Sequence, residues 1–323
     1  MAQWADLLGR FGGVLARPGG DAVERGRGRR LRQHRRLLQA ELPRALASGE
    51  IYLVYQPKFD LRAGRYDGVE TLLRWQHPSL GQVDRGSIID TAEASGQIHA
   101  LSLWILGRAI DDQRSLLARY GSLRFHVNIS GQSLANGPFI DRACAMISGA
   151  SGAIGFEITE TAFIANPPAA LANLNRLVAA GVRLSIDDYG SGHSSLAYLK
   201  ELPADELKID KLFVSGMTSS NRDPLIVRST IDLAHALGLR VVAEGVESRA
   251  TLALLRVMGC DIAQGFYISP ALPLAELERF LANAEHLKRL NDTDISLTPS
   301  RAFWTRAEVE SQGGVADILS KDE

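Results

Sequence analysis

Short runs of apolar and β-branched residues alternate along the middle of the chain with stretches whose apolar residues recur every three or four positions. The first pattern is typical of strands and the second of amphipathic helices. We expect eight strands, at Tyr52–Leu61, Tyr66–Trp75, Arg124–Ser130, Ile154–Thr159, Arg183–Asp188, Glu206–Asp210, Arg240–Val246 and Ile262–Ile268. Because these strands alternate with helical stretches, the pattern predicts an α/β fold of the TIM (β/α)8 barrel type.

The connection between the first two strands modifies this prediction. It is only the turn Arg62-Ala63-Gly64-Arg65, and parallel neighbours need a much longer crossover. We therefore expect a modified barrel with an antiparallel first strand. Helical spacing at Leu174–Ala180 and Ile226–Leu237 ends at Gly181 and Gly238, where glycine suits a left-handed cap.

The two ends of the chain differ from the barrel segment, residues 37–285, which begins with a helical pattern at Leu37–Ala47. Residues 1–36 are rich in Gly and Arg, and Arg25–Arg36 is strongly basic. That run is typical of a solvated lead-in; the alternative is a contact for a regulatory protein, an anionic partner or a membrane surface. Residues 286–323 lose the apolar spacing and predict a flexible or loosely docked tail.

Composition narrows the class of protein. The 323 residues carry a formal net charge of -1, which argues against non-specific binding to duplex nucleic acid. Cys144 and Cys260 lie among apolar or small residues, and we expect buried free thiols in a reducing compartment. No apolar run is long enough to span a bilayer, and the N-terminus lacks the pattern of a signal peptide. These features predict a soluble cytoplasmic protein without a transmembrane segment.

Polar side chains mark one face of the strand VETLLRW, residues 69–75. Alternation places Glu70, Leu72 and Arg74 on the same face. For this strand alone, an internal salt bridge between Glu70 and Arg74 is an equal alternative to a function. Further acids, amides and a lysine lie at or near the C-terminal ends of other strands: Asn128, Glu157, Glu160, Asp187, Asp188, Lys208, Asp210, Glu244 and Gln264. In a (β/α) barrel this end holds the active site.

So many carboxylates at one barrel mouth predict bound cations, because they cannot all stay ionised without them. Oxygen ligands favour Mg²⁺ or Mn²⁺. Zinc is disfavoured because four histidines of this segment do not pair at the spacing of metal ligands. They are His77, His126, His193 and His235. The acids suffice for two ions, an arrangement suited to in-line attack on a phosphodiester. The residues thus predict metal-assisted phosphoester hydrolysis.

A glycine-containing loop, residues 188–195, follows directly from a strand with two acids. Gly190 and Gly192 suit a mobile loop or unusual backbone angles. Ser194 or Ser195 is expected to cap the next helix, which is also what an ordinary turn would need. The glycine spacing matches neither the dinucleotide nor the P-loop pattern.

These residues lie in segments that resemble the EAL-domain family of bacterial cyclic di-GMP phosphodiesterases over residues 36–285. The matching segments are YQPKFDL, GVETLLRWQHP, VNIS, EITET, IDDYGSGHSSLAYLKELPADELKIDKLFV, VVAEGVES and AQGFYISP. The resemblance implies cyclic di-GMP as substrate and linear pGpG as product. It also implies a barrel with an antiparallel first strand, and a homodimer, which is frequent in this family.

Position by position, the resemblance implies a role for each matched residue. The metal ligands are Glu70, Asn128, Glu157 and Asp187, with Asp188 serving a second ion. Lys208 and Glu244 hold and activate the attacking water; the resemblance leaves the base open, and we favour a charged Lys208 that orients hydroxide. Glu160 steadies the loop that contains Gly190, Gly192 and Ser194. Substrate contacts are Gln56, Leu72, Gln264 and Arg74, the last through a phosphate oxygen.

The sequence departs from the family at three places. The namesake tripeptide contains Thr71, His193 replaces a usual Tyr, and residues 84–89 read DRGSII where the family commonly shows a Pro, two variable residues and Phe-Ile. Thr71 points away from Glu70, so we expect it to affect packing against the helices. No metal ligand is lost, which favours an active enzyme. The alternatives are a weak or silent cyclic di-GMP receptor that signals through protein contacts, and a pure interaction module, which would leave the polar face unexplained.

Overall fold

The computed structural model describes residues 35–121, 123–150, 153–159, 162, 167–190 and 199–292. The chain divides into two compact units, Met1–Ala284 and Glu285–Glu323. Of the second unit, the described part is essentially the helix α13 (Ala284–Asn291), which carries Lys288 and Arg289 in its last turn. The first unit contains all the strands of the described chain.

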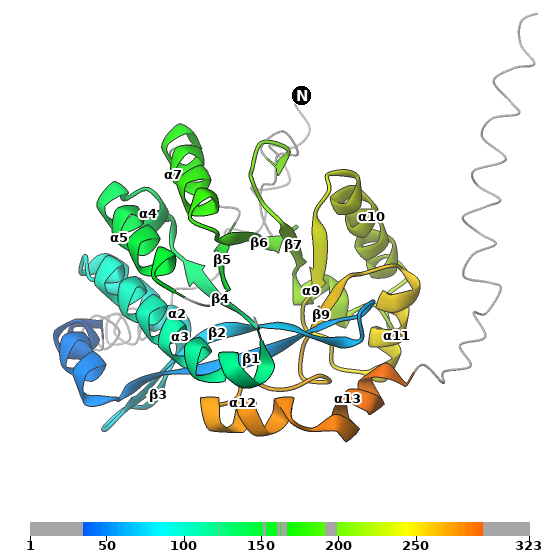
Figure 1. Cartoon of the computed structure of the whole chain (residues 1–323), viewed down its shortest axis with the longest axis horizontal. Coiled ribbons are helices and arrows are strands. Elements are labelled where there is room, and N and C mark those ends of the chain that lie inside the picture. Colours follow the sequence, from blue (N-terminus) through cyan, green and yellow to red (C-terminus); the bar gives the residue numbers. More distant parts are fainter. Residues whose placement is uncertain are drawn as a thin grey trace, which may run out of the picture. The chain divides into compact units, whose positions relative to one another are not determined.

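One sheet joins the strands of the first unit (Figure 1). The strands are β1 (Ile51–Asp60), β2 (Arg65–His77), β3 (Gly81–Val83), β4 (Arg124–Ile129), β5 (Ile154–Thr159), β6 (Arg183–Tyr189), β7 (Glu206–Ile209), β8 (Arg240–Ala243) and β9 (Ile262–Gln264). Their order is β1-β9-β8-β7-β6-β5-β4-β2-β3, and a β1–β2 pairing closes the ring. The described strands therefore form a closed eight-stranded barrel, with β3 as an extra strand at its edge.

The antiparallel first strand is confirmed. β1 runs antiparallel to β2 on one side and to β9 on the other, whereas β2, β4, β5, β6, β7, β8 and β9 run parallel to one another around the ring. The short turn after β1 permits no other arrangement for the β1–β2 pair. The predicted strands are found close to their expected bounds, but β3, which pairs antiparallel with the end of β2, was not expected.

Helices surround the barrel strands (Figure 1). They are a helix at 35–48, α2 (Arg85–Ala94), α3 (Ile98–Tyr120), α4 (Gly131–Leu134), α5 (Gly137–Ser148), α7 (Pro167–Ala179), α9 (Lys211–Ser215), α10 (Asp223–Ala236), α11 (Arg249–Val257) and α12 (Leu274–Leu281). The chain after α7 and after α10 turns through the predicted glycines, Gly181 with φ 92° and Gly238 with φ 77°. These left-handed angles are strained for residues with a Cβ and explain why glycine stands there.

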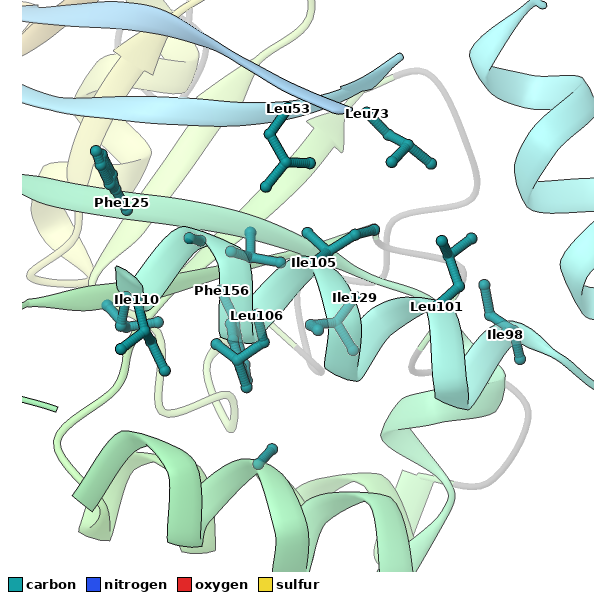
Figure 2. Packing of buried hydrophobic residues seen from close by; sticks show 14 of the residues in the cluster. Leu53, Leu73, Ile98, Leu101, Ile105, Leu106, Ile110, Phe125, Ile129 and Phe156 are labelled. Carbon is teal, nitrogen blue, oxygen red and sulfur yellow. The ribbon is translucent and has the colours of Figure 1, made fainter. Parts of the chain in front are cut away.

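The apolar core lies between the outer face of the barrel and the helices. Figure 2 shows Leu53 and Leu73 on the β1–β2 pair, with Ile105 and Leu101 of α3 among the cluster residues near them. Leu106 of α3 belongs to the same buried cluster. Strand alternation assigns one set of side chains to this layer and the other set to the barrel interior. The outer set is mainly apolar, so the inner set can be polar without loss of the core.

Thr71 belongs to the outer set, as expected. Its residue is 3% exposed, and its Oγ1 has no hydrogen-bond partner among the described residues. It lines a cavity of about 540 Å³ between β2, β4 and the helices α2 and α3. The hydroxyl has thus found room in this layer but no partner there.

The described helices include none that is both long and apolar enough to cross a membrane. Cys144 and Cys260 are free thiols; Cys260 is buried as expected, whereas Cys144 is only partly buried. The expected lead-in, residues 1–36, and the expected tail, residues 286–323, are described only at 35–36, where a helix starts, and at 286–292, of which 286–291 belong to α13.

Candidate active site

Lys208 of β7 lies at the centre of a group of acids in the barrel interior. The residue is 1% exposed. Its Nζ lies 2.5 Å from Glu244 Oε1, 2.7 Å from Glu157 Oε2, 2.9 Å from Asp187 Oδ1 and 3.9 Å from Glu70 Oε2. These acids come from β2, β5, β6 and the residue after β8. The structure therefore brings together side chains that lie up to 174 positions apart in sequence, between Glu70 and Glu244.

Side-chain amides hold Glu70 in place. Asn128 Nδ2 donates to Glu70 Oε1 at 3.0 Å, and Gln264 Nε2 donates to Glu70 Oε2 at 2.6 Å. The same Gln264 nitrogen lies 3.0 Å from Gln56 Oε1, and Gln56 Nε2 donates to the backbone oxygen of Ser269 at 3.1 Å. Glu70 is thus oriented by amides from two strands, β4 and β9, and Gln56 of β1 supports one of them, as a residue with a defined chemical role requires.

Lys58 of β1 is a second buried cation of the site, and sequence reasoning missed it. The residue is 0% exposed, and its Nζ lies 2.5 Å from Glu157 Oε1. Glu157 therefore lies between two lysines, Lys58 and Lys208. A signal was present in the sequence, because Gln56, Lys58 and Asp60 alternate along β1 and share its inward face.

The local charges keep Glu157 anionic and Lys208 cationic. Burial by itself raises the pKa of Glu157, but the attraction of Lys208 and Lys58 outweighs burial and leaves that pKa below its ordinary value. Burial likewise lowers the pKa of Lys208, but Glu157 and Glu244 outweigh it and raise that pKa well above normal. A lysine in this state donates hydrogen bonds and does not take up protons.

Glu244 differs from the other acids of the site. The pKa of Glu244 is raised to about 7. Burial is the largest cause, the attraction of Lys208 lowers the pKa, and the repulsion from Asp187 and Glu70 raises it further. Its side chain is 20% exposed, so it lies at the solvent side of the group. Its proton affinity is that of a group able to exchange protons near neutral pH.

Asp188 completes an acidic cluster with Asp187 and Glu244. One carboxylate oxygen from each of these residues lies within 4.8 Å of the others. Asp188 has φ 58°, the only positive φ of a non-glycine residue in the described chain, and its backbone N–H donates to Asp187 Oδ1 at 3.0 Å. Burial raises the pKa of Asp188, and the charges of Asp187 and Asp210 raise it further. The backbone thus keeps two carboxylates close against their repulsion.

The donor set fits a hard divalent cation. The group offers five carboxylates, Glu70, Glu157, Asp187, Asp188 and Glu244, against the two lysines Lys58 and Lys208. Gln264 Oε1 is a buried oxygen without a donor among the described residues. Excess negative charge and oxygen ligands are the features that bind Mg²⁺ or Mn²⁺.

A cavity of about 270 Å³ opens onto this group. Three predicted substrate residues, Gln56, Leu72 and Gln264, line it together with Glu70, Asp187, Asp188 and Glu244. Two cations that the sequence did not single out, Arg85 and Lys211, also line it, as does the exposed acid Glu247. An anionic ligand that enters this cavity therefore meets two positive side chains as well as acids.

Arg74 does not form the salt bridge with Glu70 that was the alternative for this strand taken alone. Its Nη1 donates to the backbone oxygen of Leu73 at 2.9 Å. The described residues contain no Glu70–Arg74 ion pair; Glu70 Oε1 instead lies 3.6 Å from Nη1 of Arg85. Burial lowers the pKa of Arg74, and Arg85 lowers it further, so the two guanidinium groups repel each other.

The glycine loop is described only at its start. Gly190 has φ 96°, an angle that favours glycine, and a Cβ there would lie 3.0 Å from the Phe213 ring, which is a tight contact. The other predicted loop residues, Glu160, Gly192 and Ser194, lie outside the described residues, as does His193.

The sequence of this barrel is similar to the sequences of known proteins. Residues 39–271 match the model of the EAL domain. Over 248 residues the chain is 42% identical to the cyclic di-GMP phosphodiesterase NbdA of Pseudomonas aeruginosa, an alignment that covers 76% of this chain and 32% of NbdA. The chain thus spans about a third of the length of that relative.

Solved structures show the same similarity. The PaMucR phosphodiesterase in complex with c-di-GMP matches with a TM-score of 0.70 and 36% identity, over 75% of this chain and 99% of that chain. An EAL domain protein from Listeria monocytogenes EGD-e matches with a TM-score of 0.66 and 28% identity, over 74% of this chain and 96% of that chain.

Proposed function

Because the chain belongs to the EAL domain family, we propose that it is a metal-dependent phosphodiesterase that hydrolyses cyclic di-GMP to linear pGpG with two divalent cations, Mg²⁺ or Mn²⁺. The observation that carries the proposal is the group around Lys208, in which four carboxylates lie within 3.9 Å of one buried ammonium. A structural salt bridge needs one carboxylate for one lysine. The surplus of acids supports cation binding.

In this proposal Glu70, Asn128, Glu157 and Asp187 hold the cations, with Asp188 on the second ion. When bound, the ions would lower the pKa of a bound water and neutralise charge on the phosphate. Glu157 keeps its charge because Lys58 and Lys208 contact it, and Glu70 keeps its orientation because Asn128 and Gln264 donate to it.

The hydrolysis uses Lys208 and Glu244, which contact each other at 2.5 Å, to hold and activate the attacking water. Lys208 is charged and donates a hydrogen bond, so it orients the water and stabilises the negative charge that develops on the oxygens bound to phosphorus. Glu244 is at the solvent side and accepts the water proton. The new P–O bond forms as the bond from phosphorus to the ribose 3′ oxygen breaks. That oxygen takes up a proton from solvent, and Glu244 returns its proton to solvent. The products are a 5′ phosphate and a free 3′ hydroxyl, as in pGpG.

The remaining assignments belong to the same proposal. Gln56, Leu72, Arg74 and Gln264 contact the nucleotide, and the lining of the 270 Å³ cavity by three of them supports this. Glu160 steadies the loop with Gly190, Gly192 and Ser194. We also propose a cytoplasmic homodimer. Arg25–Arg36 stays predicted as a solvated lead-in, with a contact for a regulatory protein or an anionic partner as the alternative.

The test is to incubate the purified chain with cyclic di-GMP and Mg²⁺ or Mn²⁺ and to follow pGpG by chromatography. We expect product with wild type and none above background with Glu70→Ala, whose circular dichroism should be unchanged. Glu276→Ala removes an exposed acid from α12 and is the matched control, with expected full activity. Binding of cyclic di-GMP without product under either ion would reject the enzyme in favour of the receptor.

A further inference from the structure

Arg85 reaches the site from outside the barrel. It is the first residue of α2, its side chain is 53% exposed, and its Nη1 lies 3.6 Å from Glu70 Oε1. It lines the 270 Å³ cavity above the acids and also the 540 Å³ cavity beside β2. Arg85 thus has space on two sides, one of which contains Glu70.

The position of Arg85 is unfavourable for the helix itself. The first turn of a helix has a partial positive charge from its free N–H groups, so a cation there is repelled. Asp84 already caps α2, because its side chain accepts from the backbone N–H of Ser87 at 3.0 Å. Helix formation therefore does not explain an arginine at this place.

The charges around Arg85 differ between the cation-free and the cation-bound site. Without a cation, Glu70 is an anion within reach of the guanidinium. Once Glu70 holds a divalent ion, that ion neutralises the carboxylate and repels Arg85. Arg74 also repels Arg85. The pKa of Arg74 is lowered mainly by burial and then by the charge of Arg85. An anionic ligand in the cavity is then an attractive partner for Arg85, beside the acid Glu247 of the same lining.

We propose that Arg85 is a second phosphate-binding residue of this site, which pairs with Glu70 in the cation-free protein and with a phosphate oxygen of the bound nucleotide once Glu70 holds a cation. This inference rests on the proposed function, since a phosphodiester supplies the anion. A planar guanidinium suits bidentate contact with phosphate. The same residue therefore weakens cation binding and strengthens nucleotide binding.

Removal of the guanidinium should then have opposite effects on two affinities. In Arg85→Gln, Glu70 loses its competing partner, and Mn²⁺ affinity without nucleotide should rise about 2- to 5-fold, the range of an exposed ion pair. Nucleotide affinity should fall about 10- to 100-fold, the range of a hydrogen bond to a charged group. Arg85→Lys keeps the charge without the planar fork and should lie between wild type and Arg85→Gln.

The experiment measures both affinities by calorimetry, with Mn²⁺ alone and then with pGpG in the presence of Mg²⁺, which avoids turnover during titration. Steady-state kinetics with cyclic di-GMP should show the loss in KM, with kcat changed less than about 3-fold, because an interaction made equally in ground and transition state affects only binding. Arg114→Gln makes the same substitution at an exposed arginine of α3 that pairs with Asp111, and it should leave both affinities unchanged. Thermal unfolding of Arg85→Gln should be unchanged or higher, since a positive charge leaves a helix N-terminus.

Unchanged pGpG affinity, or unchanged or lower Mn²⁺ affinity, in Arg85→Gln would overturn the proposal while wild-type turnover left the phosphodiesterase function intact. Wild type that binds nucleotide without turnover would reject the phosphodiesterase, and the two affinities would still decide on Arg85. If wild type binds no nucleotide, both proposals fail.

Discussion

The contact between Lys58 and Glu157 offers a direct test of how the barrel interior is stabilised. Both side chains are 0% exposed, and their charged atoms are 2.5 Å apart. Lys58→Met keeps the length and apolar stem of the side chain and removes its charge. Glu157 then remains buried with Lys208 at 2.7 Å as its one cation. Removal of one partner from a buried ion pair lowers the free energy of unfolding by about 3–5 kcal/mol. Because Lys208 still neutralises Glu157, we expect a loss at the low end, about 3 kcal/mol.

The free energy of unfolding in urea measures this loss. For a domain of this size, about 3 kcal/mol corresponds to a fall in Tm of about 6–12 °C. The double variant Lys58→Met/Glu157→Gln removes both charges, so its loss should be smaller than the sum of the single losses by about 1–3 kcal/mol. Lys200→Met makes the same change at an exposed lysine and should stay within about 0.5 kcal/mol of wild type. A loss below about 1 kcal/mol in Lys58→Met would refute the buried-pair reasoning.

Three further outcomes are expected. Thr71→Val removes a buried hydroxyl without a described partner and should raise the free energy of unfolding by about 1 kcal/mol; a decrease would mean that the hydroxyl is hydrogen-bonded. Arg240 contacts Asp60 at 2.9 Å and Asp67 at 3.0 Å from a half-exposed side chain, so Arg240→Ala should cost about 1–2 kcal/mol in urea unfolding, and equal stability would contradict this. Mn²⁺ at about 100 times its Kd should stabilise wild type by about 2.7 kcal/mol in the same assay, and much less in Asp187→Ala; equal shifts would remove Asp187 from the cation site.

The fold followed from features that act over short distances along the chain. Apolar alternation located the strands, and Gly181 and Gly238 marked where helical stretches end. The short turn at residues 61–64 forced β1 and β2 to be antiparallel. β3 was not predicted, because its three residues, Gly81–Val83, are too few to show the alternation of a strand. The barrel itself was predictable because strands that alternate with helices have few ways to bury their apolar faces.

The residues of the candidate site were also readable from the sequence, since the C-terminal ends of parallel barrel strands meet at one mouth. Glu70, Glu157, Asp187, Lys208 and Glu244 do lie together around one ammonium group. Their chemical roles stay predictions until activity and metal binding are measured.

The tertiary structure alone decided which charges pair. Glu70 contacts Arg85 and Lys208 and not Arg74 of its own strand. Glu157 contacts Lys58 in addition to Lys208. Alternation along a strand states which face a side chain occupies, but the partner on that face depends on register, strand tilt and the rotamers of residues far away in sequence. Periodicity therefore determined where the polar groups stand, and only the closed barrel determined which of them come within contact distance.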